Sequence, residues 1–245
     1  YISVEPIDTY IRKRQSEGVK LGYMHIIYSA LVRTMWVRPK LNQFVMKGRQ
    51  YRRNDITISL MIKKNMSLDG EETSVKMDFR GDETPEDIKV RLNELIEKEK
   101  NNSSEDNEMD ALVKIMDKCP QFVLRTGVKF LKFLDKNNMM PYKVIKASPF
   151  HTSAFVTNMG SLGINAIYHH LYNFGTVGVF LAIGRKNKSV KMVRGELIEE
   201  KTINLAFVSD ERICDGYYYA SALKQFFRYL KKPELLDEPI SDIEE

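Results

Sequence analysis

The sequence predicts a layered fold of the α+β or α/β class. Helical patterns dominate the first part of the chain, a strand–turn–strand pattern lies in the middle, and long strands dominate the last third. With 245 residues, of which 43% are hydrophobic and 29% are charged, the chain has globular composition and suffices for one large domain or two small ones. No apolar run approaches the ~20 residues of a membrane span, so we expect no transmembrane segment.

The N-terminal half is expected to begin with a short strand at residues 2–6, a helix over residues 7–18 closed by glycine, and a longer helix over residues 23–37 that Pro39 stops. Apolar residues that alternate with polar ones predict strands at residues 44–46, 56–62 and 75–79. A capping threonine, a proline and two acids at residues 84–87 are typical of a helix start, and this helix should run to about residue 100.

In the C-terminal half, residues 101–108 are polar and predict a loop, after which helical patterning returns from residue 109 to about residue 135. Four strands are then expected, at residues 153–158, 177–183, 190–194 and 203–209. A helix over residues 217–230 follows and ends before Pro233.

The net charge of +5 is unevenly distributed. Six acids and no basic residue follow Lys232, which leaves residues 1–232 at +11 when the whole chain carries +5. A basic body suits an anionic partner, either nucleic acid or a phosphorylated ligand such as a coenzyme. Because the basic residues are spread along the chain and accompany no recognition motif, we expect no nucleic-acid partner.

The most informative stretch is residues 207–216, Phe-Val-Ser-Asp-Glu-Arg-Ile-Cys-Asp-Gly, where a strand passes through a tight turn into a helix. It resembles the catalytic domain of the dihydrolipoamide acyltransferases of 2-oxo acid dehydrogenase complexes, which share a fold with chloramphenicol acetyltransferase. That family carries the signature His-x-x-x-Asp-Gly at this junction. Asp215 and Gly216 match it here, and Glu211 stands at the position of the histidine.

Two further stretches resemble the same family. Residues 155–160 are similar to the strand that presents a serine hydroxyl to the oxyanion, with Thr157 at the position of the serine, and residues 20–42 are similar to the first long helix and its exit. The resemblance covers about residues 4–236. It implies a chloramphenicol acetyltransferase-like mixed sheet flanked by helices, in one domain over residues 1–236 with an inserted helical segment at 109–148 and an acidic tail at 237–245.

In that family an imidazole takes the proton of the thiol of coenzyme A or dihydrolipoamide, and the thiolate attacks a thioester. The resemblance implies that Thr157 stabilises the oxyanion, that Asp215 anchors the turn, and that Gly216 permits the tight backbone there. It also implies homotrimers with active sites at subunit boundaries. Coenzyme A or an acyl-CoA is the expected substrate, and we expect no covalently bound cofactor and no metal site.

Glu211 changes this chemistry. A thiol of pKa ~8.5 that passes its proton to a carboxylate of pKa ~4.3 goes about four pKa units uphill, against about two units for histidine. The additional cost is roughly 3 kcal/mol, of which burial of the glutamate could recover part. We therefore favour loss of the thiol reaction over its retention. A carboxylate here can instead activate a hydroxyl or amine acceptor, or hold the turn.

Three histidines are candidates for a displaced base: His151, His169 and His170. A lone histidine is more often a packed or surface residue, so this is the less favoured interpretation. We take His151 and His170, together with Asn158, as candidate substrate-binding residues.

The two cysteines, Cys119 and Cys214, form no disulfide framework, and reduced thiols in a cytosolic protein are the simplest interpretation. We expect Cys214 to be a buried, inert thiol, although it lies beside the candidate site. Asp210 and Glu211 are sequential and would face opposite ways in a strand, which makes them a poor acid/base pair.

Within the inserted segment, Arg125, Lys129, Lys132 and Lys136 recur at spacings of four, three and four residues and form a basic stripe on one helical face. We favour a solvated face on a helix that caps the domain. Two alternatives stay open: a lid over the acyl pocket, and a patch for phosphate or peripheral membrane contact through residues 121–136.

These features predict a stand-alone, cytoplasmic homotrimer of the acyltransferase fold, which uses coenzyme A or an acyl-CoA, with Thr157 on the oxyanion and Glu211 in the base position. The alternative is a catalytically inactive family member, a pseudoenzyme that acts as a trimeric scaffold or ligand-binding protein. Glu211 and the additional helical segment motivate this alternative.

Overall fold

The computed structural model describes residues 1–63, 72–101 and 120–240. The strands are β1 (Ile2–Ser3), β2 (Gln43–Met46), β3 (Arg49–Arg52), β4 (Ile56–Lys63), β5 (Glu72–Phe79), β6 (Ala154–Asn158), β7 (Val179–Val193) and β8 (Glu196–Ser209). The helices are α1 (Glu5–Ser16), α2 (Tyr23–Val37), α3 (Pro85–Asn101), α5 (Gln121–Lys136), α6 (Tyr142–Ala147) and α7 (Gly216–Lys231).

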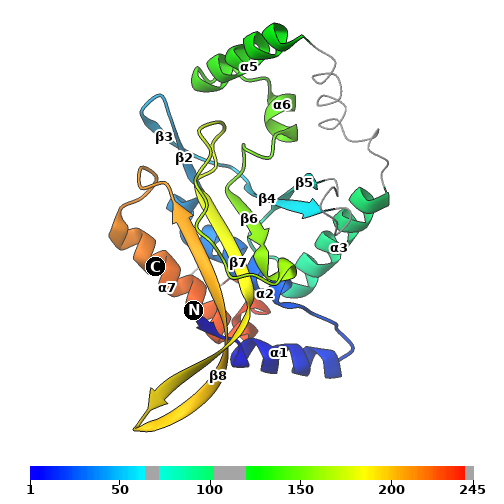
Figure 1. Ribbon diagram of the computed structural model, residues 1–245, viewed down its shortest axis with the longest axis vertical. Helices are drawn as coiled ribbons and strands as arrows, with labels where there is room; N and C mark the ends of the chain where they lie inside the picture. The colour runs from blue at the N-terminus through cyan, green and yellow to red at the C-terminus, as the bar shows by residue number, and fades with distance from the viewer. Residues whose placement is uncertain (64–71, 102–119, 241–245) are drawn as a thin grey trace.

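A six-stranded mixed sheet organises these elements (Figure 1). Its strand order is β1-β8-β7-β6-β4-β5, in which β6 runs parallel to both β4 and β7 and the other neighbours are antiparallel. The β2–β3 hairpin forms a separate two-stranded sheet. The predicted α/β class, with a mixed sheet flanked by helices, is confirmed.

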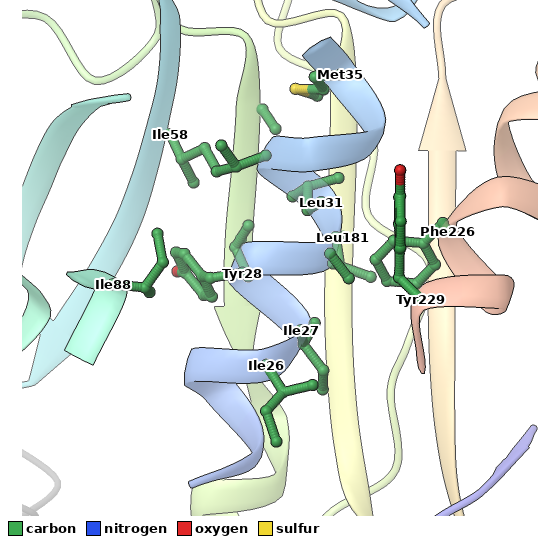
Figure 2. Packing of buried hydrophobic residues seen from close by; sticks show 14 of the residues in the cluster. Ile26, Ile27, Tyr28, Leu31, Met35, Ile58, Ile88, Leu181, Phe226 and Tyr229 are labelled. Carbon is green, nitrogen blue, oxygen red and sulfur yellow. The ribbon is translucent and has the colours of Figure 1, made fainter. Parts of the chain in front are cut away.

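Helix α2 is the centre of the hydrophobic core. All ten residues from 26 to 35 are buried, as expected for a helix that is apolar on every side. Figure 2 shows α2 between Ile58 and Ile88 on one side and Leu181, Phe226 and Tyr229 on the other. The helix therefore joins the sheet to α3 and α7 and fixes the position of the strand ends.

The two faces of the sheet are covered differently. Along β6, Ala154 and Val156 belong to the large core against the helices, whereas Phe155 belongs to a small second cluster with Val177 and Phe180. Since side chains alternate along a strand, every second residue of β6 and β7 points to this second face. We call it the open face, because it is contacted by the irregular segment 163–177 and not by the helices.

One strand prediction is wrong. The strands expected at residues 177–183 and 190–194 form one continuous strand, β7, which pairs with an equally continuous β8 across a register shift at residues 183–186. The intervening sequence Arg-Lys-Asn-Lys-Ser is polar because the hairpin projects beyond the body (Figure 1) and exposes much of both faces to solvent, so its polarity did not indicate a loop.

Several boundaries also differ from the prediction. Helix α1 begins at Glu5, because a proline is well accommodated in the first turn of a helix, and the expected first strand is only two residues long. The short α6 was not expected. The expected loop at 101–108 and the first part of the helix at 109–135 fall on residues 102–119, outside the described residues.

The beginning of the expected acidic tail is bound to the body. The hydroxyl of Tyr10 donates to the carboxylate of Asp237 at 2.8 and 2.9 Å, and the buried guanidinium of Arg33 donates to the carbonyl of Glu238 at 3.0 Å. The chain is therefore anchored two residues beyond the expected end of the domain at residue 236.

Candidate functional site

The junction of β8 and α7 is a tight turn that is fixed by its acids. Asp210 forms a bidentate ion pair with Arg212, its amide donates to the carbonyl of Gly178 at 3.0 Å, and the hydrogen bond from Arg212 lowers the pKa of its carboxyl group. Asp215 is the N-cap of α7: the amide of Tyr218 donates to its carboxylate at 2.8 Å, which lowers its pKa. The sequence thus forms a turn with one acid at each end.

Glu211 lies at the apex of this turn and is exposed. It lines a pocket of about 320 Å³, which we call the Glu211 pocket. Residues 209–212, residues 170–173 and 175–178, and Phe44 and Val45 of β2 form its walls. The side-chain amide of Gln50, from β3, donates to the carbonyl of Arg212 and fixes the hairpin against the turn. The chain thus presents the Glu211 carboxylate to solvent rather than sealing it.

The two residues after Arg212 are buried in the hydrophobic core and attach the turn to it. Ile213 and Cys214 are 1% and 8% exposed, and burial raises the pKa of the Cys214 thiol. The burial expected of Cys214 is therefore observed. A raised pKa leaves less thiolate, which is consistent with a packing role.

The expectation that Gly216 permits a tight backbone is not supported within one chain. Gly216 does not adopt a positive φ, and a Cβ added to it would meet no atom within 4 Å. It is the first residue of α7 and is exposed. Nothing in the described part of the chain therefore requires glycine at this position for steric reasons.

Thr157 belongs to the open face of the sheet. It follows Phe155 by two positions on β6 and is half-buried, and its hydroxyl contacts only the sulfur of Met159, at 3.6 Å, among the described residues. A weak acceptor of this kind leaves the hydroxyl free to donate to a ligand.

Asn158 faces the opposite way. Its Nδ2 lies 3.1 Å from the sulfur of Met24 on α2, and its Oδ1 accepts from the amide of Ser161 at 3.2 Å. It caps the short 3-10 turn at Met159–Leu162. The structure therefore gives Asn158 a structural role, and its role in substrate binding stays a prediction.

One chain does not bring Glu211 and Thr157 together. Thr157 pairs with Ala182 of β7, whereas Ser209 pairs with Val179, three positions earlier, or about 10 Å along the strand. Glu211 lies two residues beyond Ser209, and Thr157 does not line its pocket. Proton transfer needs heavy atoms about 3 Å apart, so Glu211 and Thr157 cannot act together on one reacting group within a single chain.

His151 is a packed histidine. It is 3% exposed, its Nε2 lies 2.9 Å from Oδ1 of Asp135, and its Nδ1 lies 2.9 Å from the hydroxyl of Ser148. Burial lowers its pKa, against the opposing effect of Asp135. The other carboxylate oxygen of Asp135 accepts from the amide of Gly175 at 2.9 Å. Sequence reasoning missed Asp135, although it is the single acid among residues 120–147.

The other two candidate histidines lie near the open face. His169 stacks on Phe180 with ring centroids 4.4 Å apart, so a packing role explains its position. His170 is exposed and lines the Glu211 pocket. Of the three candidates, His170 is therefore the histidine placed at Glu211.

A second pocket of about 400 Å³ adjoins the first, because Phe44 lines both. Four cations, Arg52, Arg53, Lys76 and Lys146, and two acids, Asp55 and Asp78, are among its lining residues. Burial lowers the pKa of Lys76 to about 8, and its ammonium donates to three backbone carbonyls, those of residues 145, 148 and 151. We call this the cationic pocket; none of its four cations forms an ion pair within the described residues.

The described residues contain neither a metal-binding cluster nor a membrane-spanning helix. No group of three or more histidine, cysteine, aspartate or glutamate side chains is arranged to hold a metal ion. No helix there is both long and apolar enough to cross a membrane.

Comparison with known proteins shows a shared fold over most of the chain and a sequence relationship over residues 145–237. Residues 145–237 match the model of the 2-oxoacid dehydrogenases acyltransferase (catalytic domain) family, whereas no curated protein matches. A probable dihydrolipoamide acetyltransferase from Listeria monocytogenes is 15% identical, with a TM-score of 0.63 over 94% of this chain and 81% of that one. The dihydrolipoamide acetyltransferase of Azotobacter vinelandii is 12% identical, with a TM-score of 0.63 over 96% and 81%.

A third solved structure has the same fold. The truncated catalytic core of the 2-oxoacid dehydrogenase multienzyme complex from Thermoplasma acidophilum is 11% identical, with a TM-score of 0.55 over 98% of this chain and 85% of that one. The chain thus has the fold of the dihydrolipoamide acetyltransferase catalytic cores, and its residues 145–237 are related in sequence to the acyltransferase catalytic domain of the 2-oxoacid dehydrogenases.

Proposed function

We propose that this protein is a coenzyme A-dependent acyltransferase-like protein with an altered active site, which forms between the subunits of a homotrimer. The observation that carries the proposal is the separation of two accessible half-sites, Thr157 on the open face and Glu211 on the β8–α7 turn. Within one chain, Thr157 does not have the Glu211 carboxylate beside it, and Glu211 does not have the Thr157 hydroxyl beside it. A neighbouring copy would supply the missing group.

The Azotobacter vinelandii enzyme supports these residue roles. A serine, a histidine and an asparagine have a role in its catalytic mechanism, and the last two are four positions apart, as Glu211 and Asp215 are here. The N-cap bond of Asp215 supports a role in holding the turn, so Asp215 is a positioning residue in this proposal.

The proposed reaction transfers an acyl group from a donor thioester to an acceptor thiol. A base removes the proton of the acceptor thiol, and the thiolate attacks the carbonyl carbon of the donor thioester. The Thr157 hydroxyl donates to the resulting oxyanion, a contribution worth a few kcal/mol. Collapse of the tetrahedral intermediate expels the donor thiolate, which takes up the proton held by the base.

Two groups are candidates for the base. Glu211 occupies the position of the family histidine but is exposed on a single chain, so a neighbouring subunit must bury it if burial is to make it more basic. His170 lines the same pocket and is better matched to a thiol. We propose Glu211 as the base, with His170 as a substrate-binding residue or displaced base.

The cationic pocket supports coenzyme A as the substrate. Its cations lie next to the Glu211 pocket, so a ligand whose thioester reaches Glu211 can place phosphate groups among Arg52, Arg53 and Lys146. The basic body found in the sequence is consistent with this. We propose no nucleic-acid partner and a cytoplasmic location.

Incubation of the pure protein with acetyl-CoA and dihydrolipoamide tests the reaction. We expect slow transfer that Glu211→His accelerates by at least tenfold and that Thr157→Val lowers by at least tenfold, since valine keeps the shape and removes the donor. No turnover in the wild type, unchanged by Glu211→His, contradicts the reaction. His170→Gln distinguishes the two bases, because it abolishes transfer only if His170 is the base.

A catalytically inactive trimer is the second candidate function, favoured by the exposed carboxylate in place of an imidazole. Calorimetry with coenzyme A and acyl-CoAs, together with the mass in solution, separates the candidates. A trimer that binds no coenzyme A derivative supports a scaffold, and a monomer contradicts both proposals. Submicromolar binding that Arg52→Gln and Lys146→Gln weaken, while Lys224→Gln does not, supports the coenzyme site, because Lys224 is exposed on α7 and lines neither pocket.

A further inference from the structure

Helix α5 presents an apolar face that the acyl-transfer chemistry does not use. Phe122, Phe130 and Phe133 are 72%, 59% and 57% exposed, and two valines of the same helix are also exposed. The residues turned inward are different: Asp135 is buried, and the leucines at 124, 131 and 134 are half-buried. The three phenylalanines share one face of the helix, and exposed apolar surface of this kind marks an interaction site.

A basic stripe lies along one edge of this phenylalanine face. Its members, Arg125, Lys129, Lys132 and Lys136, are all exposed, and none forms an ion pair within the described residues. Residues 120–147 contain six cations and a single acid, Asp135. Because that acid is bonded inward to His151 and Gly175, the outward surface of the helix carries positive charge alone.

The helix is held by a polar anchor. The bonds of Asp135 to His151 and to the amide of Gly175 attach its last turn to the start of β6 and to the segment over the open face. Figure 1 shows α5 standing clear of the sheet, with α6 between them. The orientation of α5 is therefore fixed without use of its phenylalanines, which are left for a partner.

The apolar and basic surface continues past the end of α5. Met139 and Tyr142 are 61% and 74% exposed, and Lys143 adds a further exposed cation. Tyrosine and lysine of this kind are suited to the headgroup region of a bilayer, where an apolar body meets a polar boundary.

We propose that α5 is a peripheral membrane-docking helix, whose phenylalanine face lies in the interface of an anionic lipid bilayer while its basic stripe contacts the headgroups. A strongly amphipathic helix with Lys and Arg on its polar side and Phe on the other binds such interfaces. Charge selects lipid over a second α5, because two stripes of the same sign repel. The inference is independent of the proposed function.

Co-sedimentation of the whole protein with lipid vesicles tests the proposal. At about 0.1 M salt, we expect binding to phosphatidylcholine vesicles that contain about one third phosphatidylglycerol, and at least tenfold weaker binding to phosphatidylcholine alone. Raising the salt to about 0.5 M should weaken the binding to anionic vesicles, because the Debye length shortens. Equal binding to both vesicle types overturns the charge argument.

Two pairs of variants assign the binding to α5. Lys129→Gln with Lys132→Gln should lower the partition coefficient about 25-fold, at about fivefold per cation. Phe130→Gln with Phe133→Gln should lower it at least as much. The matched controls are Lys13→Gln with Lys224→Gln for charge, and Met192→Gln, on the exposed β7–β8 hairpin, for apolar area; neither should reduce binding.

Circular dichroism and thermal melting verify that each variant is folded. Absence of binding by the wild type, or unchanged binding by both α5 pairs, contradicts the proposal. If the phenylalanine pair instead changes the mass in lipid-free solution, the face is a contact between copies of this chain, and the proposal is wrong.

Discussion

The two faces of the central sheet differ in how completely one chain covers them. On the helix side, Ala154, Val156 and Leu181 are at most 1% exposed, and α2 and α7 seal them. On the open face, Phe155 and Phe180 are 2% and 3% exposed, but Thr157 stays half-buried. The helix side is therefore sealed along the strands, whereas the open face is covered only in part and leaves Thr157 partly exposed.

The largest expected effect is on the helix side. Leu181→Ala removes a fully buried side chain and should lower the free energy of unfolding by about 3 kcal/mol in urea titrations. Val208→Ala, on the open face, should cost about 1 kcal/mol, because Val208 is half-buried and valine loses one carbon atom fewer than leucine. Equal losses would mean that the two faces contribute equally, and the comparison would fail.

The next effect concerns the turn that carries Glu211. Asp215→Ala removes the N-cap of α7 and should lower the melting temperature by about 3 °C. Asp215→Asn is the control, because asparagine also caps helices and should restore most of the loss. If Asn behaves like Ala, the charge of Asp215 matters more than its hydrogen bond to the amide of Tyr218.

A smaller effect is expected at the edge of the open face, where His151 is buried as a neutral ring. Burial lowers its pKa below 6.5, so the unfolded chain binds the proton more readily than the folded one. The stability from this residue is present above pH 6.5 and is lost as the pH falls through 6.5 toward the folded pKa. Thermal melts of the wild type and of His151→Gln should therefore differ in slope on acidification.

The control for this experiment is His170→Gln, because His170 is exposed and should not change that slope. A melting temperature that rises on acidification in the wild type, and not in His151→Gln, would show that protonation strengthens the bond to Asp135. Burial would then not be the dominant effect.

The smallest effect is expected at Gly216. Gly216→Ala should leave the melting temperature of a single subunit unchanged or slightly raised, because an added Cβ meets no atom and alanine favours helix. If a neighbouring subunit or a ligand approaches this position, the same change weakens trimer formation or substrate binding. Unchanged mass and unchanged binding would remove the argument for such an approach.

Much of the fold could be predicted from local patterns. Helix α2 occurs at the predicted residues 23–37, since its apolar positions and Pro39 define both its course and its end. The division of β7 was predicted wrongly, because a polar stretch in a projecting hairpin looks like a loop when only the sequence is considered. The pattern of polar and apolar residues indicates which residues are buried. It therefore gives a wrong prediction where a strand extends from the body of the protein into solvent.

The candidate site was predicted less completely. The positions of Glu211 and Asp215 follow from the strand–turn–helix pattern, which is local. The partners of His151 do not, because Asp135 lies 16 residues away on another helix. The cationic pocket combines Arg53, Lys76 and Lys146 from three separate elements, and no local signal connects them.

The sequence by itself determined the class of the fold and the resemblance to the acyltransferases, in which Glu211 is expected at the position of the histidine, because these depend on short-range pattern and residue identity. Only the tertiary structure decided that Thr157 and Glu211 lie apart within one chain and that His170 rather than His151 lies at the Glu211 pocket. It also decided that the phenylalanines of α5 face outward. Each of these depends on which strands are neighbours and which faces are covered, and long-range packing sets both.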